Sequence, residues 1–451
     1  MKARIKNQLI KNIYFGRDDT EISEHRESRV LFFDYDGTLV ASYTKSEFMT
    51  APALPDAPDH TADNLTFARW NWSLFDIYEY SRVSSNDIVI GASYTPTDAR
   101  THIYCETVET NLERFLVMTL TDDATVSWGD TGTSNVSAGD SVSVSHTYLS
   151  AGEYDITIET TGTVIFETYI AGTDVRNGSS VYKNIIFGPN VTLGEYTLAY
   201  CRRLKKVVMP CDADGHSMQT RIEQYTFYYC RGLEFIALPS GVTTLYSHSF
   251  DHVDSAIAIS LPASVTYMGP YTFFHDKSLK YFTIPPRLTE FRTQQNLQSV
   301  ILPEKLDTTM CPLTNLPLQC FYADYGLKEF IMNNRVTTVG NYLFRYCRGL
   351  ESVKLSNNLT SLSTYMFANC TALAEIDIPA SVTSIKTYCF TGCAALRKIY
   401  CRPVSPPELA STNAIPAYDN VVIYVPAASL SAYQSASNWS SFSSKIFAYN
   451  F

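Results

Sequence analysis

The sequence predicts a mainly β, multi-domain fold, in which a small β-rich module and a two-sheet sandwich precede a solenoid of parallel strands with a C-terminal cap. Three observations predict it. The second half of the chain repeats with a fixed period, residues 112–170 alternate between apolar and polar side chains, and residues 29–105 contain few amphipathic runs of helix length. A period of about 20 to 30 residues indicates stacked units, and alternation indicates strands. We expect a leader or attachment segment (1–28), a small β-rich module (29–105), a sandwich (106–170), a solenoid (171–400) and a cap (401–451).

The solenoid prediction depends on a repeat of 23 residues. Lines such as "LESVKLSNNLTSLSTYMFANC" and "LAEIDIPASVTSIKTYCFTGC" end in an aromatic-x-Phe-x-x-Cys element and then begin again with Leu. We call the last position of this element the Cys slot, and there Cys347, Cys370 and Cys393 follow one another at intervals of 23 residues. The array holds about nine units. In "LESVKL" the Leu and Val side chains point inward on a short strand, while Ser352 and Lys354 point outward.

The string "IPASVTSIKTYCFTGCAALRKIY" resembles the leucine-rich repeats of the BspA type, which occur in surface proteins of mouth and gut bacteria and of their phages. The resemblance covers about half of the chain. It implies a leucine-rich repeat solenoid whose units bury their cores only against neighbouring units.

Five of the eleven cysteines occupy the repeated slot. Stacked units would place them in a column of small buried side chains, with Phe344, Phe367 and Phe390 filling the far side of the core. A metal site needs a tetrahedral cluster with short internal spacings, and "CFTGC" offers only a lone C-x3-C. We expect structural thiols, with a disulfide as the alternative, and neither a metal nor another cofactor. The column consists of Cys201, Cys230, Cys347, Cys370 and Cys393.

The sandwich prediction comes from "ATVSWGD" and "VSVSHTYLSAGEYDITIETTG". Trp128 and Tyr154 would fill a two-sheet core, while Gly129 and Asp130 would turn the chain. The pattern resembles the polycystic-kidney-disease repeat, an immunoglobulin-like sandwich, and this implies that His146 belongs to a structural strand rather than to a catalytic site.

The segment after the array predicts a cap, because a solenoid must cover its last exposed core layer. "VVIYVPAASLSAYQSASNW" supplies a strand and then an amphipathic helix, with Leu430, Tyr433 and Trp439 available for burial.

The string "LFFDYDGTLV" resembles the first motif of haloacid-dehalogenase-type phosphatases, in which Asp34 would be the nucleophile and Asp36 the general acid, with magnesium between them. "FLVMTLTDDAT" imitates the last motif of that family with Asp122 and Asp123. The residues between these strings form no convincing strand–helix–strand units, however. We therefore expect a hairpin with Asp36 and Gly37 in its turn, and we keep the phosphatase as a remote alternative.

The rest of the first module, with "FARWNWSL" and "DIVIGASYTPTDARTHIYCETV", loosely resembles the internalin-type B-repeat. This likeness implies a small β-rich module.

Two solenoid surfaces are candidates for ligand binding. Tyr and Arg recur beside the Cys slot and supply binding energy at a low entropy cost, although a ring there could simply shield the edge of the core. The candidates in this row are Tyr200, Arg202, Tyr229, Arg231, His275, Tyr346 and Arg348. The outward strand positions carry apolar groups on a face that should meet water, which is typical of a partner site. The candidates in this second set are Phe235, Tyr281, Ile301, Ile331, Lys354 and Tyr400.

Composition excludes several functions. A net charge of −10 and a pI near 5.3 argue against nucleic-acid partners, and the lack of a run of about 18 apolar residues argues against membrane insertion. No Ser/His/Asp or paired-carboxylate constellation supports catalysis. We therefore predict a non-catalytic extracellular recognition or adhesion protein that binds a cell-surface glycan or protein through its solenoid.

The N-terminal string "MKARIKNQLIKNIY" is basic but lacks the continuous apolar core of a signal peptide. This favours mounting on a phage tail over display on a bacterial surface. We expect residues 1–28 to dock to the virion or to self-associate, with a disordered leader as the alternative.

Overall fold

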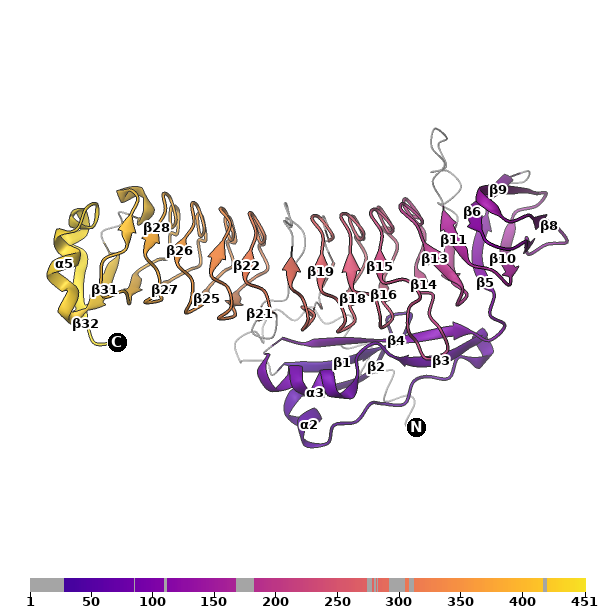
Figure 1. The fold of residues 1–451 in the computed structure, drawn as a ribbon, viewed down its shortest axis with the longest axis horizontal. Helices are drawn as coiled ribbons and strands as arrows, with labels where there is room; N and C mark the ends of the chain where they lie inside the picture. The colour runs from indigo at the N-terminus through magenta and orange to yellow at the C-terminus, as the bar shows by residue number, and fades with distance from the viewer. Residues whose placement is uncertain are drawn as a thin grey trace.

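The computed structural model shows a long solenoid that carries a sandwich at one end, a helical cap at the other and the N-terminal module along its side (Figure 1). The predicted fold class is confirmed. The structure describes residues 28–84, 86–108, 112–167, 182–273, 278–279, 281, 283–291, 305–307, 312–416 and 420–451.

The turns of the solenoid contribute their strands to two rows. The first strand row consists of β12 (Tyr182–Ile186), β14 (Lys206–Val208), β16 (Phe235–Ala237), β18 (Ala258–Ser260), β21 (Lys305–Asp307), β23 (Glu329–Ile331), β25 (Ser352–Lys354), β27 (Glu375–Ile378) and β29 (Lys398–Cys401). The second strand row consists of β13 (Val191–Leu193), β15 (Arg221–Ile222), β17 (Thr244–Leu245), β19 (Tyr267–Met268), β20 (Glu290–Phe291), β22 (Asn315–Leu316), β24 (Thr338–Val339), β26 (Ser361–Leu362), β28 (Ser384–Ile385) and β30 (Glu408–Leu409).

Neighbouring turns are held in register by parallel pairing and by repeated side-chain hydrogen bonds. Ser352 pairs with Glu329 across the first strand row. At the second strand row the Thr266 hydroxyl donates to the Thr243 carbonyl (3.2 Å), and the Thr289 hydroxyl donates to the Thr266 carbonyl (3.0 Å), each across 23 residues. The predicted period of 23 residues is therefore the spacing of these turns.

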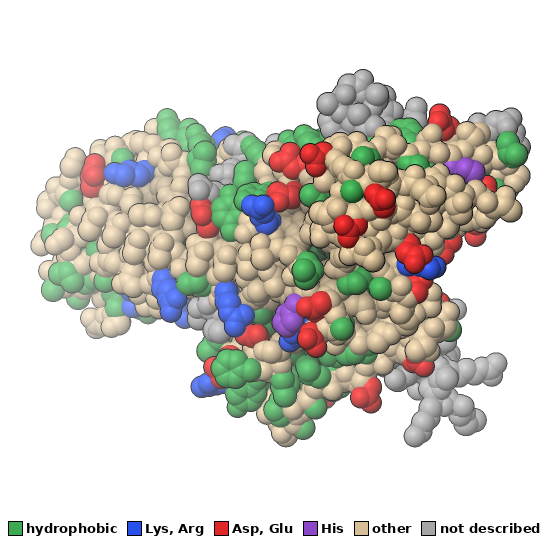
Figure 2. Space-filling view, turned by 45° about the vertical axis from the view of Figure 1, so that its right-hand side comes forward, with side chains coloured by type: hydrophobic (Ala, Val, Ile, Leu, Met, Phe, Trp, Pro, Cys, Tyr) green, Lys and Arg blue, Asp and Glu red, His purple; other side chains and the backbone are tan. Residues whose placement is uncertain are grey.

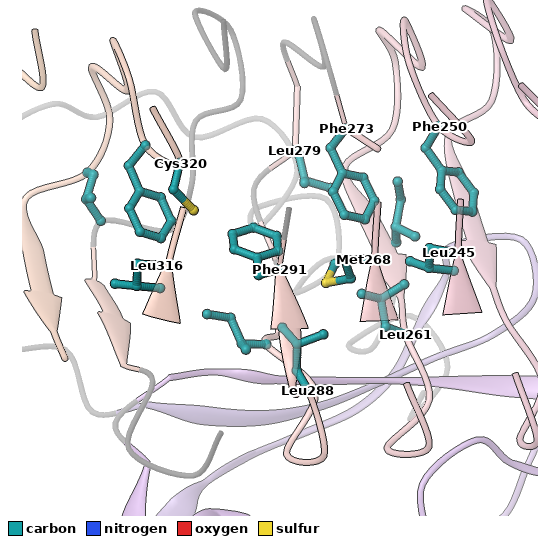
Figure 3. Packing of buried hydrophobic residues seen from close by; sticks show 14 of the residues in the cluster. Leu245, Phe250, Leu261, Met268, Phe273, Leu279, Leu288, Phe291, Leu316 and Cys320 are labelled. Atoms are coloured by element: carbon teal, nitrogen blue, oxygen red, sulfur yellow. The ribbon is translucent and has the colours of Figure 1, made fainter. Parts of the chain in front are cut away.

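The core between the rows is filled by one apolar layer per turn. Figure 3 shows Leu245, Met268 and Phe291 from the second strand row together with Phe250 and Phe273 from the turns above it. The predicted phenylalanine column is confirmed, because its rings are buried and stack with centroids about one turn apart. These distances are 5.5 Å for Phe344–Phe367 and 5.4 Å for Phe367–Phe390.

The predicted cysteine column is also confirmed. Its five cysteines are buried and are not joined by disulfides. The Cys370 thiol donates to the Phe344 carbonyl (3.1 Å), and the Cys393 thiol donates to the Phe367 carbonyl (3.0 Å). Burial raises the pKa of Cys370 well above its usual value, so these thiols are neutral packing groups.

The sandwich is continuous with the solenoid. One of its sheets contains β5 (Thr101–Thr107), β7 (Ala124–Ser127), β8 (Thr133–Val136) and β10 (Gly152–Thr160), and the other contains β6 (Leu112–Leu120), β9 (Gly139–Tyr148) and β11 (Val164–Glu167). β12 pairs with β5 on one side and β14 on the other, and β11 pairs with β13. Both sheets thus run on into the two strand rows. The boundary predicted after residue 105 falls inside β5.

The interior of the sandwich follows the expected pattern. Trp128 is fully buried, and its carbonyl accepts a hydrogen bond from the Tyr148 hydroxyl (2.6 Å). Tyr154 stacks on Tyr148, and Gly129 turns the chain with a φ of 83°. His146 stacks on Trp128 and pairs with an aspartate of the turn, which is a structural role.

The cap extends the first strand row with β31 (Val422–Pro426) and β32 (Ile446–Tyr449), joined by η3 (Ala427–Ser429), α5 (Leu430–Ser435) and η4 (Trp439–Lys445). Trp439 and Tyr433 are buried as predicted, and Leu430 is partly buried against the same core. Their polar atoms close the last turn: Trp439 Nε1 donates to the Pro407 carbonyl (2.7 Å), and the Tyr433 hydroxyl donates to the Pro403 carbonyl (2.7 Å).

The N-terminal module is a four-stranded sheet with helices on one face. Its strands are β1 (Arg29–Phe33), β2 (Leu39–Thr44), β3 (Leu65–Trp70) and β4 (Ile88–Pro96), in the order β2-β1-β4-β3, and its helices are α2 (Lys45–Thr50), η1 (Thr61–Asp63) and α3 (Leu74–Val83). The ten-residue helix α3 was not expected from the sequence. The helices cover the far face of the sheet, while the near face lies against the solenoid (Figure 1).

One buried carboxyl interrupts the thiol column. Asp324 occupies the Cys slot 23 residues before Cys347 and is fully buried. Its Oδ1 accepts from the backbone N–H groups of Gly326 (3.1 Å) and Leu327 (3.2 Å), whereas Oδ2 lacks a hydrogen-bond partner within the described ranges. Burial raises the pKa of Asp324 from 3.8 to about 8.

Asp324 should make stability depend on pH. The folded chain keeps a proton on Asp324 that the unfolded chain releases above about pH 4. The free energy of unfolding should therefore fall as pH rises from about 4 to about 8, by at most about 1.4 kcal/mol per pH unit. Asp324→Cys restores the thiol and should be more stable than the wild type at about pH 8, with a smaller difference at about pH 5. Urea unfolding at both values measures this. Val253→Cys, a change in the same slot of another turn, should give a pH-independent effect, and the same result for Asp324→Cys would contradict the prediction.

Candidate ligand-binding surface

The N-terminal module covers part of the outward face of the first strand row. Phe235, expected to meet water, is only 1% exposed because the ring of Phe33 from β1 packs on it at 5.4 Å between centroids. Tyr281 contacts the same Phe33 ring at 5.9 Å. The prediction that Phe235 presents a free apolar surface is therefore wrong: a segment about 200 residues earlier in the chain occupies it.

Polar contacts fix the module in this position. Asn71 Nδ2 donates to the Leu238 carbonyl (2.9 Å), and Trp72 Nε1 donates to the Leu261 carbonyl (2.7 Å), so the module satisfies carbonyls that follow β16 and β18. Figure 2 shows charged side chains of both signs along the line where the module meets the solenoid. Buried hydrogen bonds of this kind are costly to break, and the module is therefore a fixed part of the surface.

The phosphatase-like string forms the predicted hairpin. β1 and β2 pair in antiparallel orientation, and Gly37 adopts a φ of 85° in the turn. Asp34 stands at the end of an inner strand, as the motif requires, but its Oδ2 pairs with His60 Nε2 (2.7 Å). Asp36 pairs with Lys206 of the solenoid (3.1 Å), so the turn serves as a contact between the module and the solenoid.

The string that imitates the last phosphatase motif lies in the sandwich, not in the N-terminal module. Asp122 and Asp123 belong to the loop between β6 and β7 of the sandwich. Asp122 accepts a hydrogen bond from the Thr161 hydroxyl (3.0 Å), and Asp123 accepts one from the Ala138 N–H (2.9 Å). These carboxylates stabilise sandwich loops, and no described group of three or more His, Cys, Asp or Glu side chains is arranged to hold a metal ion.

Beyond the module, the described outward positions remain at least partly accessible. Lys354 on β25 is exposed, and Ile331 on β23 is half-buried. Tyr400 on β29 is half-buried and stacks on Tyr424 of the cap. Ile301 and His275, which we also predicted to bind ligand, lie outside the described residues.

The aromatic row beside the Cys slot lies at sharp corners of the turns. Tyr200, Tyr229 and Tyr346 all adopt left-handed φ values of 60° to 67°. Tyr200 and Tyr229 stack with centroids 5.4 Å apart, and the guanidinium of Arg231 lies 4.9 Å from the Tyr229 centroid. Arg202 and Arg348 are exposed beside the row. Tyr200, Tyr229 and Arg231 are therefore brought together, whereas Tyr346 and Arg348 belong to a turn further along the solenoid.

A second aromatic row, four residues earlier in each turn, was missed. Its rings stack along the same edge at centroid distances of 4.6 to 5.2 Å. Arg345 lies between the rows, 4.7 Å from the Tyr346 centroid and 5.0 Å from the Tyr365 centroid. A repeated Tyr or His ahead of the Phe in each line was the available signal. The members are Tyr196, Tyr225, His248, Tyr271, Tyr342, Tyr365 and Tyr388.

Comparisons with known proteins concern the solenoid. Residues 191–310 and 314–407, slightly less than half of the chain, match the BspA type leucine rich repeat region in six copies. The repeat core is therefore a leucine-rich repeat solenoid of the BspA type. The resemblance of the sandwich to the polycystic-kidney-disease repeat stays a prediction. The resemblance of the N-terminal module to the B-repeat stays a prediction as well.

Solved structures resemble the chain as well. A leucine-rich repeat protein from Eubacterium ventriosum has 24% sequence identity and a TM-score of 0.39, with 47% of this chain and 59% of that chain covered. A leucine rich cell surface protein from Faecalibacterium prausnitzii has 20% identity and a TM-score of 0.31, with 62% and 76% covered. A leucine-rich repeat protein from Bacteroides ovatus has 19% identity and a TM-score of 0.31, with 65% and 97% covered. No curated protein matches the chain.

A side chain at Gly91 should separate the module from the solenoid. Gly91 lies in β4, where an added Cβ would collide with Ala237 and crowd Ser260. Gly91→Leu should therefore uncover Phe235 and speed hydrogen–deuterium exchange of β1 and β16 by at least about tenfold, because the interface has no room for it. Thr66→Leu, at an exposed position of β3, is the control. Unchanged exchange in Gly91→Leu would show that the module and the solenoid do not depend on this contact.

Proposed function

We propose that the protein is a non-catalytic extracellular recognition or adhesion protein that binds a cell-surface glycan or protein through its solenoid. Leucine-rich repeat proteins are generally non-enzymatic, and the repeat core matches the BspA type. The similar Faecalibacterium prausnitzii protein is a leucine rich cell surface protein, and we take an extracellular setting for this chain as well. Within the part of the chain that the structure describes, no helix is long and apolar enough to cross a membrane.

The observation that carries the proposal is that aromatic side chains occupy corners of the turns where the backbone is left-handed. The position of Tyr346 is filled by Asn369 and Gly392 in the next two turns, all with positive φ. Asn and Gly are the residues that tolerate this conformation, whereas a bulky side chain costs about 1 kcal/mol. The fold therefore does not require Tyr346. A ring with a neighbouring guanidinium is typical of residues that supply binding energy.

Substitutions that preserve the corner test the proposal. Full-length Tyr346→Asn and Tyr229→Asn should lose at least about tenfold in binding to gut-bacterial cells, because the ring leaves while the φ stays allowed. Apart from the effect of the lost ring stacking, their free energies of unfolding should change by less than about 1 kcal/mol. Lys354→Glu tests the outward face in the same assay.

Leu149→Ser, at a strongly exposed site of the sandwich, is the matched control. Loss of binding in a solenoid variant alone would support recognition by the solenoid. Equal binding by Tyr346→Asn, Tyr229→Asn and Lys354→Glu would place the site away from the aromatic row and from the outward position of β25, and would contradict the assignment of binding to these two surfaces.

The mounting of the protein is a separate proposal. Display on a bacterial cell and attachment to a phage tail both suit a recognition solenoid. Docking was predicted for residues 1–28, of which residues 1–27 lie outside the described ranges. Immunogold labelling of cells and of released phage particles distinguishes the two mountings.

A further inference from the structure

An exposed aromatic cluster stands at the far end of the outward face, beyond the N-terminal module. Asp377, Tyr400 and Tyr424 are partners on the neighbouring strands β27, β29 and β31. The Tyr400 and Tyr424 rings stack at 5.1 Å, and the Tyr449 ring from β32 lies 5.4 Å and 5.3 Å from them at steep angles. Tyr449 is 42% exposed, so one ring of the cluster presents open surface to solvent.

A charged pair forms the rim of the cluster. Arg402 Nε donates to Asp377 Oδ1 (2.6 Å), and a terminal guanidinium nitrogen donates to Oδ2 (2.7 Å), in a bidentate geometry. Both side chains remain nearly half exposed. The pair is neutral as a unit, and it still offers unused N–H donors and carboxylate lone pairs to a ligand.

The fold does not need these rings. Ile399, Ile423 and Ile446 on the same strands already complete the core, and all three are buried. Two turns earlier, Ser352 and Lys354 occupy the outward positions of β25 without any ring. The aromatic cluster is therefore an addition to the outward face rather than a requirement of the solenoid.

The part of this face that the N-terminal module covers is a protein–protein contact within the chain, and its composition can be compared with that of the cluster. There, Phe235 is flanked by the small residues Ala237 and Ala258, and Gly91 lets a strand approach closely. The accessible cluster is instead made of large rings, with exposed Phe447 and Phe451 beside them. The neutral pair of Arg402 and Asp377 lies at its edge. A pyranose ring has a face of C–H groups, which can lie on an aromatic ring, and a border of hydroxyl groups, which can bond to a paired Arg and Asp.

We propose that Tyr449, Tyr424 and Tyr400, with Asp377 and Arg402, form a binding site for neutral pyranose units of a carbohydrate. An anionic or cationic ligand does not suit it, because the charges of the rim are already paired. The inference rests on the proposed function in that the solenoid is taken as the recognising element, and it names both the ligand class and the place.

Isothermal titration of the full-length protein with neutral oligosaccharides tests the inference. The probes are maltohexaose, cellohexaose, mannohexaose, xylohexaose and chitohexaose at millimolar concentration. At least one should bind, and Tyr449→Ser and Asp377→Asn should each weaken it at least about tenfold. Tyr449→Phe, which keeps the ring, should stay within about threefold of the wild type. Phe75→Ser removes a ring that is 70% exposed on α3 and should leave sugar binding unchanged.

The outcomes separate this inference from the proposed function. Near-ultraviolet circular dichroism shows whether a variant keeps its folded cap, and Tyr449→Phe remains informative if Tyr449→Ser does not fold. Binding to cells without binding of any oligosaccharide, or sugar binding that survives both Tyr449→Ser and Asp377→Asn, overturns the inference and leaves the proposed function standing. Cell binding that protease treatment of the cells abolishes, and that no oligosaccharide inhibits, identifies a protein ligand and also overturns it.

Discussion

The whole structure depends on the register between successive turns. Each turn supplies strands of only a few residues, which cannot persist alone and gain stability by pairing with the turns on either side. A shift of one residue would turn the outward side chains into the core. The ladders of Thr243, Thr266 and Thr289 hydroxyls and the stacked Phe344 and Phe367 rings all repeat at the same spacing, so they hold the register that the short strands alone do not fix.

A structure that is stable only through neighbours must be closed at both ends, and the two ends are closed differently. At the N-terminal end the sandwich extends its two sheets directly into the two strand rows, so that the first turn meets a complete layer. At the C-terminal end the first strand row continues through β31 and β32, while Trp439 and Tyr433 cover the last layer and satisfy carbonyls of the chain before the cap. Both ends therefore supply hydrogen bonds as well as apolar cover.

Features that recur in the sequence could be predicted, and features that arise from a single long-range contact could not. The Cys370 and Phe367 columns follow from a period that is visible in the chain itself. Phe235 was misjudged because its outward position resembles that of Lys354, and nothing local indicates that β1 covers one and not the other. The ring at Tyr346 was predicted, but its left-handed backbone was not, because Asn and Gly rather than Tyr usually mark such corners.

The docked module divides the outward face into two chemically different parts. Near β16 and β18 the face is apolar and lined by small side chains, and it contacts a sheet of the same chain through the turn that holds Asp36. Towards β29 and β31 the same positions carry tyrosines beside a paired Arg402 and Asp377. Because the core beneath both parts is alike, the difference cannot come from folding the solenoid. It follows the division between the part that binds the chain's own module and the part that remains accessible to a ligand.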